Sequence, residues 1–378
     1  MTKSVVAVVA NVKRFRLPFY RLLAEELLTR GVDLKVVYSD PDSVEALKCD
    51  SVDLPAPVGV RVKARYLFGN RALVQIPPLR LLARADLVIV VQASSYLLNY
   101  FLLPMAWFGI KSVAFWGHGF NHQGDRRSLT ERLKRLLATK VHWWFTYTQA
   151  TGGYLIDLGF PADRITVIEN APDTRSFARE VASVGRADTR ETRRVLGIPD
   201  EACVGLFCGS LYAEKKLDFL IRVGDDLYQK HPNFRMIVIG GGPESGLMRD
   251  AVNSRTWLYY CGPQFGLEKA RLFAAADVFI NPGLVGLAIL DSFAAGLPFV
   301  TSTYEGHSPE IAYLEHGHNG LLPPLELRAF AEGVERLILN DMVLQSLRRG
   351  ARAASGRYTV ENMVRNVASG IYRCLRIG

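Results

Sequence analysis

A glycine-rich loop and the start of a helix meet within residues 281–295, a pattern that suits a phosphorylated ligand. Gly286 lets the backbone approach a ligand closely, and the free N–H groups of Leu287 and Ala288 open the expected helix. Asp291 lies one turn further on, where its carboxylate can accept hydrogen bonds from ribose hydroxyls. Phosphate and ribose together make a nucleotide, so this segment predicts a nucleotide-sugar site.

A second candidate phosphate contact precedes it in the chain. Gly209 and Ser210 form a turn that leads to Lys215, whose ammonium group could clamp a diphosphate together with backbone N–H groups. A lysine before a helix is often merely solvated, and the assignment relies on the Gly286 loop in the same expected domain. The glycine run around Gly241 lacks the dinucleotide-binding spacing, and we interpret it as a tight turn that lines the nucleotide pocket.

Candidate residues in the first half of the chain follow expected strands at their carboxyl ends. Asn11, Arg14 and Arg16 follow the first strand, and we expect them to contact an acceptor that carries phosphate. His118 ends a later strand between two glycines, and its imidazole could donate a hydrogen bond to the transferred sugar. A structural role is the alternative for this histidine; the other loop histidines, including His307, are expected to be exposed.

Two further segments raise the question of a membrane. A basic cluster with aromatic residues upstream predicts either a solvated helix face or a patch for a lipid-phosphate acceptor. The cluster consists of Arg126, Arg127, Arg132, Lys134 and Arg135. The most apolar segment, residues 97–110, is interrupted by Asn99 and Pro104 and is too short to span a bilayer. It predicts a buried or surface-seeking helix.

Apolar, β-branched runs alternate with helical-period segments throughout, which is typical of parallel sheets covered on both faces. The expected strands are 5–10, 34–38, 87–91, 112–116, 143–146 and 165–168, then 204–208, 235–239, 258–261, 278–280 and 299–301. Two such series predict an α/β protein with two doubly wound, Rossmann-like domains facing across a cleft. We expect an acceptor domain over 1–173, a linker over 174–195, a nucleotide-sugar domain over 196–357, and a helix over 358–378 that crosses back to the first domain.

Composition supports a folded protein of two domains. The 378 residues are 49% hydrophobic, with no low-complexity tract and no signal peptide, so we expect a cytoplasmic protein, peripheral at most on the inner face of the membrane. Residues 1–173 hold 22 Lys and Arg against 15 Asp and Glu, compared with 24 against 22 in the remainder. The basic half suits an anionic partner or simply solubility. The five cysteines show no metal-ligand spacing, and we expect no metal and no cofactor.

These segments resemble the retaining glycosyltransferases of family 4, which have the GT-B fold. Residues 207–217 are similar to the family's "GRL…EKG" segment, which places Lys215 at its phosphate-binding lysine, and residues 239–243 to its "GxGP" turn. The "HG" that bears the active-site histidine is similar to the sequence around His118. Glu310 lies in a segment similar to the "PEI" that follows the sugar-contacting loop, and residues 170–173 resemble "NGVD".

Departures from the family pattern fall on the donor site. The family's paired glutamates map onto Gly283 and Asp291, so the sugar-contacting glutamate is missing and the ribose-contacting one is shortened. The lost sugar contact would pass to the N–H groups of Leu287 and Ala288 or to another side chain. Ser210 stands where the family usually has arginine.

The resemblance implies metal-independent transfer of a sugar, with retention, from a UDP- or GDP-type donor to a saccharide or lipid-linked acceptor, as in polysaccharide or glycan biosynthesis. His118, Lys215 and Asp291 are the expected catalytic residues. A catalytically silent nucleotide-sugar binder or scaffold, and a GT-B nucleotide-sugar epimerase, remain alternatives. We expect no nucleic-acid partner, because the basic residues form no recognisable module.

Overall fold

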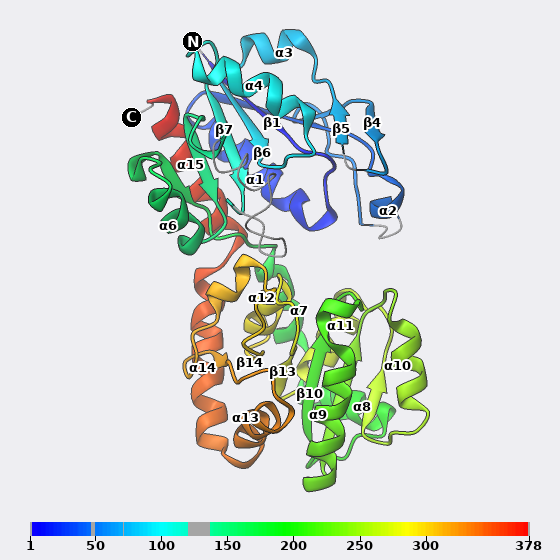
Figure 1. Cartoon of the computed structure of the whole chain (residues 1–378). Helices are drawn as coiled ribbons and strands as arrows, with labels where there is room; N and C mark the ends of the chain where they lie inside the picture. The colour runs from blue at the N-terminus through cyan, green and yellow to red at the C-terminus, as the bar shows by residue number, and fades with distance from the viewer. Residues whose placement is uncertain (1, 47–49, 71, 120–136, 377–378) are drawn as a thin grey trace. The chain divides into compact units, whose positions relative to one another are not determined.

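The computed structural model describes residues 2–46, 50–70, 72–119 and 137–376. The chain divides into two compact units: Met1–Pro172 together with Val360–Gly378, and Asp173–Thr359 (Figure 1). Each unit contains a parallel sheet with helices on both faces, so the predicted fold of two doubly wound, Rossmann-like domains is confirmed.

The sheet of the first unit has seven strands, and hydrophobic side chains alternate between its two faces. Its order is β3 (Gly59–Arg61), β2 (Val32–Tyr38), β1 (Lys3–Val8), β6 (Leu87–Val91), β7 (Val113–Gly117), β8 (Trp143–Thr146) and β9 (Ile165–Val167). Val5 packs into a core on one face and Val6 into a core on the other, as the two-residue period of a strand requires.

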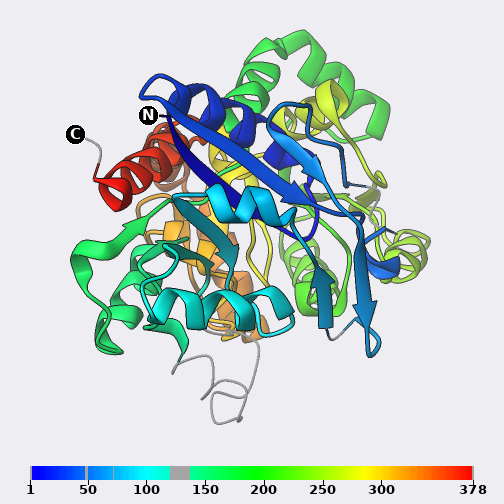
Figure 2. The ribbon, with the colours of Figure 1, turned by 90° about the horizontal axis from the view of Figure 1, so that it is seen from above.

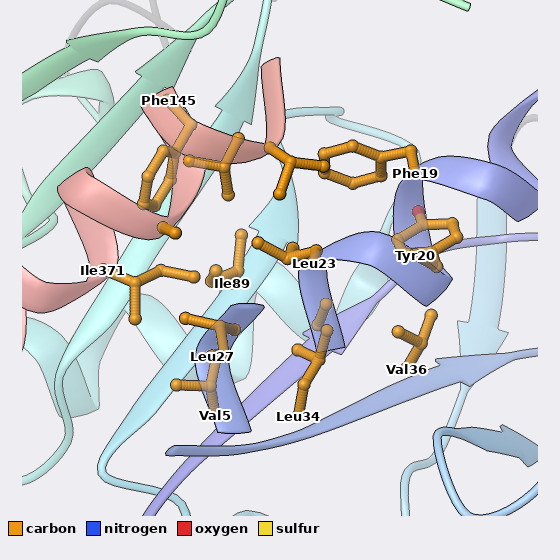
Figure 3. Close-up of a cluster of buried hydrophobic side chains, with 14 of the residues drawn as sticks. Val5, Phe19, Tyr20, Leu23, Leu27, Leu34, Val36, Ile89, Phe145 and Ile371 are labelled. Carbon is orange, nitrogen blue, oxygen red and sulfur yellow. The ribbon is translucent and has the colours of Figure 1, made fainter. Parts of the chain in front are cut away.

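One face of this sheet is covered by α1 (Leu17–Leu28) and α15 (Val360–Leu375), which lie side by side (Figures 1 and 2). Figure 3 shows Leu27 of α1 and Ile371 of α15 pointing into one cluster with Val5 and Phe145. The carboxyl-terminal helix is therefore an integral part of the first unit's core.

The other face carries α3 (Leu79–Arg84), α4 (Leu97–Trp107) and α6 (Gln149–Asp157). Shorter elements complete the unit. They are α2 (Ser43–Ala46), the 3-10 helices η1 (Arg14–Arg16) and η2 (Ala162–Arg164), and a hairpin of β4 (Ala64–Leu67) and β5 (Ala72–Gln75).

The sheet of the second unit has six strands, in the order β12 (Leu258–Tyr260), β11 (Phe234–Ile239), β10 (Cys203–Cys208), β13 (Val278–Ile280), β14 (Phe299–Val300) and β15 (Gly320–Leu321). Its helices are α7 (Thr174–Ser183), α8 (Arg186–Leu196), α9 (Leu217–Lys230), α10 (Ser245–Val252), α11 (Gly266–Ala274), α12 (Ala288–Ala294), α13 (Leu327–Leu339) and α14 (Asp341–Arg357), with the 3-10 helices η3 (Ala213–Lys215) and η4 (Pro309–Tyr313).

The expected linker over 174–195 is instead occupied by α7 and α8, which belong to the second unit. Asp173 caps α7, its Oδ1 accepting a hydrogen bond from the Ser176 N–H at 2.9 Å. Phe177 of α7 is buried against Phe273, with ring centroids 5.0 Å apart. The many charges of this segment lie mainly on the outer faces of two amphipathic helices.

Candidate functional site

Both sheets reverse their strand order at one point, and in the second unit candidate residues follow the two strands that meet there. In the second unit β10 lies between β11 and β13, so the chain leaves the two neighbours β10 and β13 in opposite directions. Ligands in open parallel sheets bind in the crevice outside the carboxyl ends of such a pair. The segments after β10 and β13 hold Lys215 and Asp291.

Lys215 is a buried cation. Its side chain lies in η3 with only 5% of the residue exposed, and Nζ donates a hydrogen bond to the Leu284 carbonyl at 2.6 Å. Burial lowers the pKa of this ammonium group to about 8. Among the described residues no carboxylate forms an ion pair with it. A buried cation that lacks an anion is unfavourable unless a ligand supplies one.

Asp291 is already engaged by a lysine that the sequence reasoning missed. Lys269 of α11 places Nζ 2.7 Å from Asp291 Oδ2, and both side chains are largely buried. Burial lowers the pKa of Lys269, but the Asp291 carboxylate and its hydrogen bond outweigh this effect and leave the pKa above its ordinary value. Asp291 retains Oδ1 as an acceptor for a ribose hydroxyl. Both lysines and Asp291 act electrostatically on Cys208, so the four groups form one cluster.

Gly283 occupies a position that has no space for a side chain. A Cβ added there would lie 2.2 Å from the Glu214 carbonyl oxygen and 2.4 Å from the Lys215 carbonyl carbon. The Leu284 N–H donates to the same Glu214 oxygen at 2.8 Å, which ties the loop after β13 to η3. The backbone of η3 therefore fills the space that a side chain at position 283 would need.

The turn after β10 crosses the turn after β11 at equally close range. A Cβ on Gly240 would lie 1.8 Å from the Gly209 carbonyl oxygen, and one on Gly242 would lie 2.4 Å from that of Leu211. Leu211 N–H donates to the Gly241 carbonyl at 2.9 Å. These contacts make the glycine run a packing requirement of the two turns and place Gly209, Ser210 and Gly241 next to one another.

His307 holds the loop after β13 in place, although the sequence reasoning expected an exposed histidine. It is buried, its Nδ1 accepts from the Val285 N–H at 3.0 Å, and its Nε2 lies 2.8 Å from the Ser302 carbonyl. This pattern requires neutral imidazole with the proton on Nε2. Burial lowers the pKa of His307, in keeping with that neutral form. A buried histidine has no simple sequence signal, because loop histidines are usually solvated.

The remaining donor-site candidates lie beside this loop. Gly286 has open space where a Cβ would be, and the half-buried Leu287 and Ala288 lead into α12. Ser308 N–H donates to the Val285 carbonyl at 3.2 Å, which brings the buried Glu310 of η4 close to the same loop. Ser210 is exposed.

The first unit has a cavity of about 430 Å³ at its own switch point, between the carboxyl ends of β1 and β6. Aromatic rings line much of it: Phe15, Tyr20, Tyr66, Tyr96, Trp116 and Tyr147. Burial raises the pKa of Tyr20 to about 12, so this phenol is neutral near pH 7 and can both donate and accept hydrogen bonds.

The lining of this cavity carries two cations and two carboxylates, so its charges balance. Lys13 pairs with Glu45 of the lining, and also with Asp50 outside it, whose Oδ1 lies 2.8 Å from Lys13 Nζ. Arg16 donates to Asn170 within the same unit, and Asp42 adds a second carboxylate to the lining.

Asn11 and Arg16 line the cavity, whereas Arg14 is exposed and lies outside its lining. Among the described residues, the Asn11 side chain has no hydrogen-bond partner, so its amide is available to a ligand.

His118 follows β7 at the same sheet edge and is exposed. Its ring centroid lies 4.4 Å from that of Tyr147, a lining residue of the cavity. The adjacent Gly119 has φ of 73° and accepts a hydrogen bond from Gln92 Nε2 at 3.1 Å. The glycine after His118 is thus required by the backbone conformation of the turn.

The basic cluster from Arg126 to Arg135 lies outside the described residues. In the part of the chain that the structure describes, no three His, Cys, Asp or Glu side chains lie together as a potential metal site. No helix within the same ranges is long and apolar enough to cross a membrane.

Comparison with known proteins gives two family matches and many similar structures. Residues 19–176 match the model of Glycosyltransferase Family 4, and residues 202–340 match that of Glycosyl transferases group 1. D-inositol 3-phosphate glycosyltransferase of Acidothermus cellulolyticus is 29% identical over 248 residues, 60% of this chain and 52% of that protein. Alpha-monoglucosyldiacylglycerol synthase of Acholeplasma laidlawii is 26% identical over 52% of this chain and 49% of that protein. The chain thus spans about half the length of these curated relatives.

The fold is shared with Anabaena HepE, solved in complex with UDP. The TM-score is 0.68 at 18% identity, and the match covers 98% of this chain and 99% of that one.

Proposed function

Since the chain belongs to the glycosyltransferases of family 4 and group 1, which have the GT-B fold, we propose that it transfers a sugar from a nucleotide-diphosphate donor to a saccharide or lipid-linked acceptor. We further propose that transfer retains the anomeric configuration, needs no metal, and serves polysaccharide or glycan biosynthesis. UDP is our first choice of nucleotide, because the HepE structure was solved with it.

The observation that carries the proposal is the buried ammonium group of Lys215, which no described carboxylate neutralises. Two lysines and one carboxylate meet at the switch point, and Lys269 uses that carboxylate. The positive charge of Lys215 therefore has no anionic partner among the described residues. A diphosphate supplies the missing anion, and its negative charge grows as the sugar leaves, so Lys215 stabilises the transition state more than the ground state.

The other donor-site residues position the ligand in this account. Ser210 and the N–H groups of Gly286, Leu287 and Ala288 would complete the diphosphate contacts, with Gly209 and Gly241 allowing close approach. Asp291 would accept from the ribose through Oδ1 while Lys269 holds Oδ2.

Glu310 and His118 are proposed sugar contacts. Front-face attack, in which the leaving diphosphate takes the acceptor proton, leaves the protein with orientation and charge stabilisation. Proton NMR of the product's anomeric centre tests retention.

The cavity of the first unit is the proposed acceptor site. Its aromatic walls and the unpaired Asn11 amide suit the apolar faces and hydroxyl groups of a sugar ring. Because its cations and carboxylates balance, we propose an acceptor whose bound part is an uncharged saccharide, in place of the phosphate expected from the sequence. Arg14 lies outside that lining, and we propose no acceptor contact for it.

A catalytically silent nucleotide-sugar binder is the second candidate, and Gly283 favours it. Without the glutamate at this position the donor sugar loses one contact, and the structure has no space to restore it. An epimerase would form product without an acceptor. Product analysis separates both candidates from a transferase.

Thermal stability in the presence of UDP, GDP or ADP tests the donor site directly. A nucleotide at about 100 times its dissociation constant adds about 2.7 kcal/mol, enough for a shift of several degrees. We expect a selective shift that is lost in Lys215→Met and kept in the matched Lys216→Met variant, whose side chain lies over the Tyr304 ring. No shift with any nucleotide would contradict the donor-site assignment.

A further inference from the structure

The exposed face of α4 consists of aliphatic and aromatic side chains and carries no charge. Five outward residues of α4 recur at helical spacing and, with Phe108 directly after the helix, form what we call the α4 stripe: Leu97, Tyr100, Phe101, Pro104, Trp107 and Phe108. Phe101, Trp107 and Phe108 are 59%, 69% and 76% exposed. A surface helix normally presents polar residues on its solvent-facing side, so the stripe is an unusual exposed apolar surface.

The opposite face of α4 is the one that packs into the core of the first unit. Asn99, Leu102, Leu103 and Ala106 already pack into the first unit, and Asn99 Nδ2 donates to the carbonyls of Val91 and Ala93. The helix is therefore fixed in orientation, and rotation cannot bury the stripe. Figures 1 and 2 show α4 at the surface of its unit.

Cations flank the carboxyl-terminal end of the stripe. Lys140 Nζ lies 5.2 Å from the centroid of the Trp107 ring, and that ring stacks on Phe108 with centroids 6.1 Å apart. Lys111 donates to the carbonyls of Ala83 and Ala85 at 3.0 and 2.8 Å, which places the exposed Arg84 nearby. The sequence from Leu87 to Gly124 contains no Asp or Glu.

We propose that the α4 stripe docks the protein on the surface of an anionic phospholipid bilayer. Aromatic and aliphatic side chains enter the boundary between head groups and acyl chains, where tryptophan is favoured, and the flanking cations contact anionic head groups. A second copy of the chain fits less well, because a two-fold axis through the stripe would bring the same cations together. This inference is independent of the proposed reaction.

Trp107 is a built-in reporter for this surface. It is the exposed member of the five tryptophans, and the other four are buried or half-buried. With vesicles of phosphatidylcholine and phosphatidylglycerol in equal parts, we expect its emission to shift to shorter wavelength and to be quenched by brominated acyl chains. High salt should weaken the binding. A Trp107→Phe variant should lose the spectral signal yet still sediment with the vesicles.

Paired variants test the stripe itself. Phe101→Ser with Phe108→Ser should lower vesicle partitioning at least about tenfold. Phe265→Ser with Met342→Ser, which removes two apolar side chains of the second unit that are 81% and 82% exposed, should leave partitioning unchanged. Failure to sediment, sedimentation without Trp107 quenching, or a stripe variant that only turns a dimer into a monomer would overturn the proposal. None of these assays needs a sugar donor or enzyme turnover, so their outcome does not depend on the proposed function.

Discussion

The Lys269 ammonium group lies 2.7 Å from the Asp291 carboxylate, so the residue expected to bind ribose is also half of a largely buried ion pair. Asp291→Asn would leave Lys269 buried without its anion, which we expect to destabilise the second unit by about 3 kcal/mol. The double variant Asp291→Asn with Lys269→Met should regain much of that stability in urea unfolding, while UDP affinity stays low. Full recovery of UDP affinity in the double variant would exclude Asp291 from ribose binding.

Lys215 predicts a pH dependence of donor binding. Burial sets its pKa at about 8, below the unfolded value of 10.5, so the folded protein holds fewer protons than the unfolded chain between these values. From this group alone, stability of the free protein rises as pH increases through that window. UDP affinity changes the opposite way: it should fall by up to about tenfold per pH unit above pH 8, because the diphosphate needs the ammonium form.

Calorimetric titration of UDP in two buffers of different ionisation enthalpy measures the UDP affinity and the protons taken up on binding. We expect net proton uptake near pH 8. Lys215→Arg keeps its charge at every pH used and should give a flat profile. Equal UDP affinity at pH 7 and pH 9 in the wild type would contradict the proposal that Lys215 binds the diphosphate.

Two neighbouring glycines should respond differently to one added methyl group. In Gly283→Ala the new Cβ meets the Glu214 carbonyl at 2.2 Å, and we expect a loss of about 1–3 kcal/mol. In Gly286→Ala it meets nothing within 4 Å, and stability should be unchanged within about 0.5 kcal/mol. Urea unfolding measures both variants. An equally stable Gly283→Ala protein would show that η3 and the loop after β13 separate easily.

The cavity of the first unit, our proposed acceptor site, predicts different effects of substitution at two residues only three positions apart. Asn11→Ala removes an unpaired amide from the lining, and the KM for a saccharide acceptor should rise about tenfold with kcat little changed. Arg14→Ala alters an exposed residue outside the lining and should leave KM unchanged. Steady-state kinetics at saturating donor measures KM and kcat of both variants. A larger rise in KM for Arg14→Ala than for Asn11→Ala would contradict the assignment of the acceptor site to this cavity.

His307 predicts that the loop after β13 is sensitive to acid. Its folded-state pKa is lowered, so the stability it contributes is present above the unfolded value of about 6.5 and is lost as pH falls below it. His307→Gln can still accept from the Val285 N–H and should flatten the decline in melting temperature between about pH 7 and pH 5. An unchanged decline in the variant would show that other groups cause it.

The strand pattern predicted most of the fold because each strand is a short apolar run between helical segments. The predicted strands 87–91, 143–146 and 278–280 agree with β6, β8 and β13 at both ends. Four short strands were missed, β3, β4, β5 and β15, because each has at most four residues and little apolar alternation.

A motif can identify a candidate site residue in the sequence, whereas a residue that is positioned by packing leaves no such signal. The motif identified Lys215 in the sequence, whereas the burial of its side chain became known only from the structure. Lys269 and His307 came from long-range contacts, with partners 22 residues away in the chain. The missing glutamate at Gly283 was visible in the sequence, but the reason, a carbonyl oxygen of η3 in its place, was not.

Sugar transfer is tested most directly by nucleoside diphosphate release from UDP-glucose and GDP-mannose, each with and without a panel of neutral mono- and disaccharides. We expect release that depends on an acceptor, falls at least about 100-fold in Lys215→Met, and persists in Lys216→Met. Release that needs no acceptor, or binding of UDP with no turnover of any donor and acceptor pair, would contradict a sugar transferase.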